Sequence, residues 1–282
     1  MKKTILPVIA LTAMMTVTAC GNETAPEITE AAAVQKPSET FSIETSTAAV
    51  PVPETTASDT SAEPEQEIIV PPAEDFKYSY DAVLEGVFIE GYTGEADMIR
   101  IPTELEGDPV VKLSLQYCKQ IRYVEIPGGI TNLDSGAFRS CDNLQEVVLP
   151  EGITEISIYA FTFCDSLETV VIPDTVETIG NSAFTHCKSL EEIVIPENVT
   201  KIDDSAFYSC SSLKSVTLPD GIESIGWRAF VGCESLRSLE LPDNISSVDS
   251  QSFMNCNALT VTYKGNEYNY SNWDDLCSAV NG

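Results

Sequence analysis

The sequence predicts a β-rich repeat solenoid, a right-handed coil of 23-residue repeats with a parallel strand ladder and short helical turns, capped at both ends. Phenylalanine, proline and cysteine each return every 23 residues in one register over roughly the last two thirds of the chain. Three residue types in phase exclude a simple bias of composition. A fixed period of about 20 to 30 residues indicates that each repeat buries its apolar face only against its neighbours. The repeated residues are Phe138, Phe161, Phe184, Phe207, Phe230 and Phe253; Pro127, Pro150, Pro173, Pro196, Pro219 and Pro242; and Cys118, Cys141, Cys164, Cys187, Cys210, Cys233 and Cys256.

The charge of the chain narrows the classes of partner. The 282 residues carry a formal net charge of −29. This acidity argues against binding of nucleic acid, whose phosphates need a basic face, and against unaided docking to an anionic membrane. It is typical of a soluble, exported and self-repelling protein. The only long apolar run lies at the N-terminus and is too short to span a membrane.

Residues 1–19 have the organisation of a secretory signal peptide, with a short basic start, an apolar run and then small residues. The run ends at Ala19-Cys20-Gly21, which resembles a bacterial lipobox. That resemblance implies a diacylglyceryl thioether on Cys20 and cleavage before it, so that the lipid is the only contact with the membrane. An ordinary signal peptide followed by an accidental cysteine is the alternative.

Residues 20–75 are poor in large apolar side chains and rich in Thr, Pro, Ala and Glu. Such a segment cannot bury enough apolar surface to offset the entropy of ordering, so we expect a disordered acidic tether. Its prolines and like charges extend it. A long spacer after a lipid anchor suits a lipoprotein on the outer face of a cell with a Gram-positive wall.

Residues 76–110 are predicted to form an N-terminal cap that covers the first apolar face of the solenoid. Short strands are expected at 87–89 and 98–102. The first repeat is irregular, because two extra residues lie near 106–109 and Ser114-Leu115 replaces the Ala-Phe pair. Irregular terminal repeats are what capping predicts.

The regular repeats occupy residues 111–258, and one copy illustrates the conformation expected for all of them. Ile193 and Ile195 alternate with outward-facing residues, which predicts a strand. Pro196 ends that strand because proline cannot donate to a ladder. Ser205-Ala206-Phe207 is expected to open a short turn of helix, with Phe207 at the centre of the coil. Stacked copies, roughly 4.8 Å apart, then align like side chains in columns.

Residues 259–282 are predicted to form the C-terminal cap. A turn at 264–266 leads to a short strand at 267–270 and a helix at 272–280. Asn272 is expected to be the N-cap of this helix, and its first turn is acidic, as the helix dipole favours.

The repeat resembles that of the BspA-type (Treponema-type, leucine-rich repeat 5 class) leucine-rich repeat proteins. The consensus Leu-x-x-Val-x-Ile-Pro-x-x-Val-x-x-Ile-x-x-x-Ala-Phe-x-x-Cys recurs in phase over about residues 99–263, and with the caps the likeness covers about 76–282. The resemblance implies a bacterial surface lipoprotein that binds other proteins or host matrix. Members differ widely in partner, so the resemblance supplies no ligand.

The repeat cysteines are predicted to be free, buried, structural thiols, because each occupies a position whose neighbours point inward. Parallel side chains in a column do not have the dihedral that a disulfide needs. A linear column also offers no tetrahedral set for zinc, so no metal site is expected. A disulfide is the alternative, and Cys277 is the cysteine most open to one.

No catalytic residue and no cofactor are expected. His186, the only histidine, occupies a variable position before Cys187 that accepts Ser, Phe, Gly and Asn in other copies, which indicates a solvent-exposed site. Adjacent acids such as Asp203-Asp204 do not face each other across a cleft, as the carboxylates of a glycosidase must. They indicate a solvated acidic face.

The variable strand positions give the candidate ligand-binding residues. One outward column contains an apolar strip of three valines, continued by Thr217 and flanked by Glu146 and Glu192. An exposed apolar strip with a polar rim marks an interaction site. The competing interpretation is that β-branched residues simply suit an exposed parallel ladder. The strip consists of Val148, Val171 and Val194.

Three aromatic residues in otherwise polar columns, Trp227, Tyr208 and Phe163, are secondary candidate anchors, since aromatic side chains dominate binding hot spots. We therefore predict a cell-surface lipoprotein with a non-enzymatic protein-interaction or adhesion module. Its partner would be a protein or a host or cell-surface matrix ligand, and the chain itself a monomer. A glycan-binding surface module is the alternative.

Overall fold

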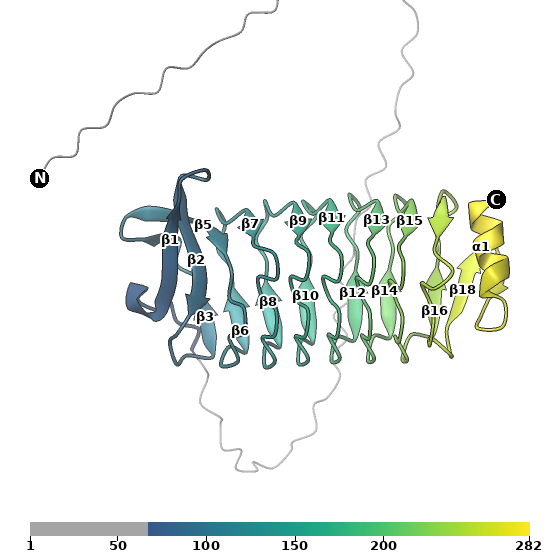
Figure 1. Cartoon of the computed structure of the whole chain (residues 1–282), viewed down its shortest axis with the longest axis horizontal. Coiled ribbons are helices and arrows are strands. Elements are labelled where there is room, and N and C mark those ends of the chain that lie inside the picture. The colour runs from purple at the N-terminus through teal and green to yellow at the C-terminus, as the bar shows by residue number, and fades with distance from the viewer. Residues whose placement is uncertain (1–66) are drawn as a thin grey trace, which may run out of the picture. The chain divides into compact units, whose positions relative to one another are not determined.

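The computed structural model describes residues 67–282. They form a solenoid whose coils stack between the hairpin of β1(Phe76–Asp81) and β2(Gly86–Tyr92) at one end and helix α1(Trp273–Asn281) at the other (Figure 1). The repeat solenoid with a parallel ladder, predicted from the sequence, is confirmed. The predicted signal peptide (1–19), Cys20 and the tether as far as residue 66 lie outside the described residues.

Each coil contributes a strand of about three residues to one side of the solenoid, called the strand face, and most coils contribute a two-residue strand to a ladder on another side. The register is parallel and in phase with the period, so Val147 pairs with Val170. The strand face contains β3(Met98–Arg100), β6(Tyr123–Glu125), β8(Glu146–Val148), β10(Thr169–Val171), β12(Glu192–Val194), β14(Ser215–Thr217), β16(Ser238–Glu240) and β18(Thr260–Tyr263). The second ladder contains β9(Glu155–Ile156), β11(Thr178–Ile179), β13(Lys201–Ile202), β15(Ser224–Ile225) and β17(Ser247–Val248).

The core is a stack of phenylalanine rings along the solenoid. From Phe138 to Phe253 the centroids of successive rings lie 5.1 to 5.8 Å apart, with interplanar angles of 13° or less. Trp273 of α1(Trp273–Asn281) covers the last ring at 5.4 Å. At the other end Leu115 is fully buried at the position that phenylalanine holds in later coils. The caps therefore close the apolar stack at both ends.

The segment predicted as a short turn of helix is instead a run of tight turns, called here the turn edge. In one copy, the amide of Ala206 donates three residues back to the Asp203 carbonyl (3.3 Å), while the amide of Phe207 donates to Ala229 of the next coil (2.8 Å). Ser205 and the residue before each cysteine have positive φ. An α-helix would bond its amides internally. These turns send alternate amides outward and join the coils into a ladder.

The cysteine column lies just inside the turn edge, and every repeat cysteine is buried and free. Each thiol donates to the carbonyl of a core residue in the preceding coil. Examples are Cys164 Sγ to Phe138 O (3.0 Å) and Cys210 Sγ to Phe184 O (3.0 Å). The column thus satisfies buried carbonyl groups, which explains why a small polar sulfur suits this position. Cys277 is also free and half-buried.

The N-terminal cap contains a strand that the sequence did not reveal. β1(Phe76–Asp81) pairs antiparallel with β2(Gly86–Tyr92), and β2 pairs parallel with β5(Asp108–Leu113). The predicted strand at 87–89 is part of β2, and the two extra residues near 106–109 form a turn. Within that turn Glu106 and Gly107 both have positive φ and connect β4(Glu104–Leu105) to β5, as two-residue hairpins require. β7(Asn132–Leu133) pairs with β5.

The folded domain begins before the boundary drawn from the sequence. Residues 67–75 were assigned to the tether, but Ile69 forms a parallel bridge with Ile99, and Ala73–Asp75 forms the 3-10 helix η1. The amide of Arg100 donates to the Ile69 carbonyl at 2.7 Å. A short apolar, β-branched segment therefore covers the free edge of β3, where a sheet end needs a partner.

The C-terminal cap largely follows the prediction. β18 and β19(Asn266–Tyr268) form an antiparallel hairpin, and α1 follows. Asn272 occupies the N-cap position but its side chain does not cap the helix. Its Oδ1 accepts instead from the amide of Asn269 (2.6 Å), so it closes the preceding turn.

Candidate functional site

The strand face displays two outward side chains from each strand. In β8, Val147 is buried, while Glu146 and Val148 on either side of it are exposed. The same alternation holds in β10, β12, β14 and β16. Because neighbouring strands pair in register, equivalent side chains form columns across the face.

The valine strip lies open on this face. The exposed fractions are 38% for Val148, 70% for Val171 and 64% for Val194. Thr217 continues the column, and the flanking Glu146 and Glu192 are also exposed. The structure therefore brings the six candidate residues of the strand face onto one surface that no other described segment covers.

The strand face is interrupted at two places. It consists of three separate sheets, β3-β6-β8-β10, β12-β14 and β16-β18-β19, so β10 is not paired with β12, nor β14 with β16. After several paired strands the next backbone amide donates to the following coil, as from Ile126 to the Val148 carbonyl (3.0 Å) and from Ile195 to the Thr217 carbonyl (2.9 Å). Among the described residues the corresponding bonds of Ile172 and Leu218 are missing at both interruptions, and that of Leu149 is missing as well, although β8 and β10 are paired.

The first interruption forms the β10/β12 groove. One hollow of about 320 Å³ is lined mainly by apolar residues, including Val171, Ile172 and Val194. A second hollow of about 680 Å³ is lined by polar and acidic residues, and it shares Glu168, Thr169 and Glu192 with the first. The two most exposed valines of the strip thus flank a continuous groove.

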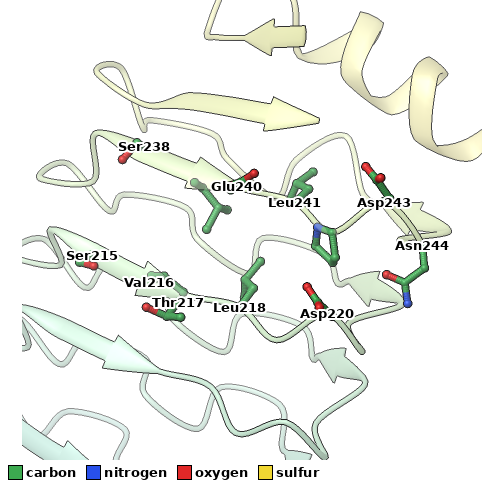
Figure 2. Close-up of a pocket in the computed structure, with 12 residues that line it drawn as sticks. Ser215, Val216, Thr217, Leu218, Asp220, Ser238, Glu240, Leu241, Asp243 and Asn244 are labelled. Atoms are coloured by element: carbon green, nitrogen blue, oxygen red, sulfur yellow. The ribbon is translucent and has the colours of Figure 1, made fainter. Parts of the chain in front are cut away.

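The second interruption forms the β14/β16 groove, a hollow of about 810 Å³. Figure 2 shows Thr217 and Leu218 on one side of it and Glu240 and Leu241 on the other, with Asp243 and Asn244 near one end. Its exposed residues are mostly hydroxyl, amide and carboxylate groups. The two grooves therefore arise from the same break in pairing but differ in surface chemistry.

The interruptions do not extend through the coil. Beside the β10/β12 groove, the rings of Phe161 and Phe184 are 5.1 Å apart, as close as elsewhere in the stack. On the second ladder Ile179 still pairs with Ile202. The coils therefore remain packed at the core and separate only at the strand face, which slightly uncovers the core residue below each groove. Val170 and Val216 are 8% and 9% exposed, against 1% for Val147.

Two secondary anchors meet at a second surface. The ring of Phe163, which is exposed, stacks on His186 at 4.8 Å, and His186 meets the edge of Tyr208 at 5.7 Å. The sequence indicated a solvent site for His186, and this was wrong, because stacking between aromatic neighbours half-buries the ring. Burial, assisted by Lys188, lowers the pKa of His186. These three residues are called the aromatic cluster.

Trp227, the third secondary anchor, stands apart from the aromatic cluster. It is exposed, and its amide donates to Asp204 Oδ1 at 2.8 Å. The guanidinium of Arg228 lies 4.2 Å from the centroid of its ring. A cation already covers part of the indole, which reduces the surface that a ligand would meet.

The pKa values of the repeat thiols differ along the column, since the hydrogen bond with Cys233 lowers that of Cys256 while burial raises those in the middle. Burial raises the pKa of the Cys210 thiol to about 12 and that of Cys187 well above its usual value, so neither is a thiolate at neutral pH. Within residues 67–282, no group of three or more His, Cys, Asp or Glu side chains is placed to hold a metal ion. Over the same residues, no helix is long and apolar enough to cross a membrane.

Solved structures similar to this chain are bacterial leucine-rich repeat proteins. One from Bacteroides ovatus is 28% identical, with a TM-score of 0.62, over 67% of this chain and 51% of that one. A leucine-rich cell surface protein from Faecalibacterium prausnitzii is 31% identical, with a TM-score of 0.60, over 69% and 54%. A leucine-rich repeat protein from T. pallidum is 32% identical, with a TM-score of 0.56, over 60% and 80%.

This chain spans about half the length of the B. ovatus and F. prausnitzii proteins. No curated protein matched in the corresponding sequence comparison. A family model described as the BspA type leucine-rich repeat region matches in six copies, at residues 110–216 and 200–273. These residues make up more than half of the sequence, and the chain belongs to the BspA-type leucine-rich repeat family.

Proposed function

We propose that this chain is an exported lipoprotein whose repeat domain is a non-enzymatic module for binding other proteins, with the strand face as its binding surface. The observation that carries the proposal is the exposed valine strip. Apolar side chains on successive coils, with an acidic rim, form a patch that a partner can desolvate. Adhesion to a protein of a neighbouring cell or of a host matrix is the role that such a surface supports.

The test is capture of partners from a cell-surface or matrix extract on the immobilised protein. The variant Val171→Glu/Val194→Glu places carboxylates in the centre of the patch, where a partner would have to bury them, so captured proteins should be lost. The control Thr178→Glu/Thr200→Glu adds the same charge at exposed positions of the second ladder or next to it and should retain them. Capture that is unchanged in the folded strand-face variant would exclude this surface.

The location at the cell surface is a separate part of the proposal. It is supported by the lipobox-like residues at Cys20 and by the likeness to the F. prausnitzii cell surface protein. A Gram-positive envelope would suit the long acidic spacer. Cys20→Ala should release the protein from the membrane fraction into the medium, and mass spectrometry should find a diacylglyceryl group on Cys20 of the native protein. Membrane retention of Cys20→Ala would contradict the anchor.

Glycan binding is the second candidate, and the aromatic cluster favours it. A hollow of about 490 Å³ next to His186 and Tyr208 is also lined by Ser209, Glu234 and Asn255. Aromatic faces beside hydroxyl, carboxylate and amide groups match the apolar face and the hydroxyl groups of a sugar. A glycan array should show hits that Tyr208→Ala abolishes, and an array without hits would count against this candidate.

A further inference from the structure

We propose that the β10/β12 groove binds an extended protein segment that presents a basic and an aliphatic side chain on the same face, two residues apart. The proposal rests on the protein-binding role of the strand face proposed above and specifies the chemistry of the partner. It concerns this groove alone, because the β14/β16 groove lacks the exposed valines.

The groove has two halves of different chemistry along the direction of the strands. Its apolar half is lined by Val171, Ile172 and Val194, and its polar half by Glu168, Glu191 and Glu192, together with serine and threonine hydroxyls. The break in pairing opens the apolar half to a depth at which Val170, a core residue, becomes partly accessible. An aliphatic side chain can therefore enter between the coils and lose contact with water.

The carboxylates of the groove are available to a partner. Glu168 and Glu192 are exposed, as is Asp174 in the lining of the apolar half, and none of the three forms an ion pair among the described residues. Glu191 is held by Lys214 at 2.7 Å, so it is already compensated. Unpaired carboxylates beside an apolar surface select a basic group next to an aliphatic one, because complementary charge steers and orients the partner.

The same charge argument excludes two occupants of the groove that this protein could itself supply, its own N-terminal segment and a second copy of the chain. Lys36 is the only basic residue between Cys20 and Gln66, so the preceding segment of this chain would bring carboxylates to an acidic groove. A second copy would present the same acidic strand face, and the formal net charge of each chain is −29. In both cases the repulsion between like charges opposes binding in the groove. A cationic segment of another protein remains.

The spacing of the partner's side chains follows from the strands that form the groove. Glu192 and Val194 lie on the same side of β12, two residues apart, with the buried Ile193 between them. An extended segment lying along the strand has the same repeat, since alternate side chains point to the same face and residues rise by about 3.3 Å each. A lysine or arginine opposite Glu192 therefore places an aliphatic side chain two residues away opposite Val194.

The experiment uses fluorescein-labelled peptides and the purified protein, with fluorescence anisotropy as the readout. The peptide Ser-Lys-Ser-Lys-Ser-Leu-Ser-Leu presents lysine and leucine on one face. The peptide Lys-Leu-Lys-Leu-Ser-Ser-Ser-Ser has the same composition but places lysine and leucine on opposite faces. A third peptide replaces each lysine of the first with glutamate. We expect the first peptide to bind about tenfold or more tightly than the other two, and its affinity to fall as salt rises.

Two matched variants locate the binding. Glu168→Gln/Glu192→Gln, and separately Val171→Ser/Val194→Ser, should each weaken the first peptide about tenfold. The control Glu240→Gln/Asp243→Asn removes the same charge from the β14/β16 groove and should change affinity less than about twofold. All substituted side chains are exposed on the strand face or its end, and circular dichroism would show that the fold is retained.

The outcomes separate this inference from the proposed function. Equal binding of the two lysine peptides, or loss of binding in the control variant, would show general attraction to an acidic surface and overturn the inference. Absence of binding by every peptide would also overturn it. If extract proteins are still captured in a way that Val171→Glu/Val194→Glu abolishes, the strand face remains a binding surface for partners of another chemistry. If the unmodified protein binds none of the peptides and also captures no extract protein, both proposals fail.

Discussion

The turn edge and the strand face follow the same 23-residue period, yet they differ in continuity. At the turn edge every regular coil bonds to the next, as in the amides of Phe161, Phe184 and Phe207 with the carbonyls of Ala183, Ala206 and Ala229. On the strand face the pairing stops after β10 and again after β14. Repetition of the sequence therefore guarantees stacking of the coils but not closure of every ladder between them.

The difference has a physical cause in what each region buries. Both regions bury side chains on the inside, but only the turn edge lies over the phenylalanine stack and the cysteine column, whose thiols also donate to backbone carbonyl groups of the preceding coil. The outward residues of the strand face touch only one another and water. Interactions between exposed side chains are weak, so the strand face can open where the turn edge cannot. Binding surfaces arise where the fold tolerates such openings.

The largest effect is expected from the core beneath the turn edge. Truncation of a fully buried ring in the middle of the stack, Phe184→Ala, should lower the free energy of unfolding by roughly 3–5 kcal/mol. Urea denaturation followed by circular dichroism measures this. Phe163 is exposed and stacks on His186, so Phe163→Ala should lower the free energy of unfolding by only about 1 kcal/mol or less. Similar losses in the two variants would contradict the assignment of the stack as the core.

The cysteine column predicts sensitivity of the turn edge to alkali. Burial raises the pKa of the Cys210 thiol from 9.0 to about 12, so the folded state keeps a proton that the unfolded chain releases. The stability contributed by this thiol is complete below pH 9.0 and is lost as pH rises towards about 12. Between these two pH values, each such thiol should lower the free energy of unfolding by about 1.4 kcal/mol per pH unit.

Melting temperatures measured as a function of pH test this prediction. The variant Cys187→Ser/Cys210→Ser keeps a donor for the carbonyl groups but does not titrate in this range, so its melting temperature should fall less steeply. Tyrosines and lysines titrate equally in both proteins, so the difference in slope isolates the thiols. Parallel curves would show that these thiols do not control alkaline stability.

Hydrogen exchange compares the two regions directly. The amides of Ile172 and Leu218, which lack their inter-coil bonds, should exchange about tenfold or more faster than those of Ile126 and Ile195. The amide of Phe184 at the turn edge should be among the slowest. Nuclear magnetic resonance of the protein in deuterated buffer gives these rates residue by residue. Equal protection of Ile172 and Ile195 would mean that the strand face is continuous and that the β10/β12 groove does not exist.

The smallest effect is expected from charges at the turn edge. Lys188 and Asp165 form an ion pair at 2.7 Å, with side chains 50% and 43% exposed. Its removal in Lys188→Ala should change the free energy of unfolding by less than about 0.5 kcal/mol, since solvent screens the pair. The equivalent change Lys119→Ala in another coil provides the comparison. A loss near that of Phe184→Ala would show that charges, and not the core and backbone, hold the turn edge together.

Much of this fold could be predicted from the sequence because side chains in phase must form columns when coils stack. The buried phenylalanine stack and the outward valines follow from the period, and its irregular ends indicate caps, but strand β1 and the contribution of Ile69 to the N-terminal cap do not follow from it. The prediction failed where a residue's role depends on the neighbouring coil. The repeat predicts a variable, solvent-exposed position for His186, but Phe163 and Tyr208 on the adjacent coils pack against its ring.

The repeat alone specifies which side chain faces inward and which faces outward, since that depends on local backbone geometry and on the apolar pattern of one coil. Only the packed structure shows that Ile69 completes the edge beside β3, that the thiols bond to carbonyls of the preceding coil, and that β10 and β12 separate. These features depend on distances between coils, which result from the packing of the whole stack. The valine strip was therefore visible in the sequence, and the groove that divides it was not.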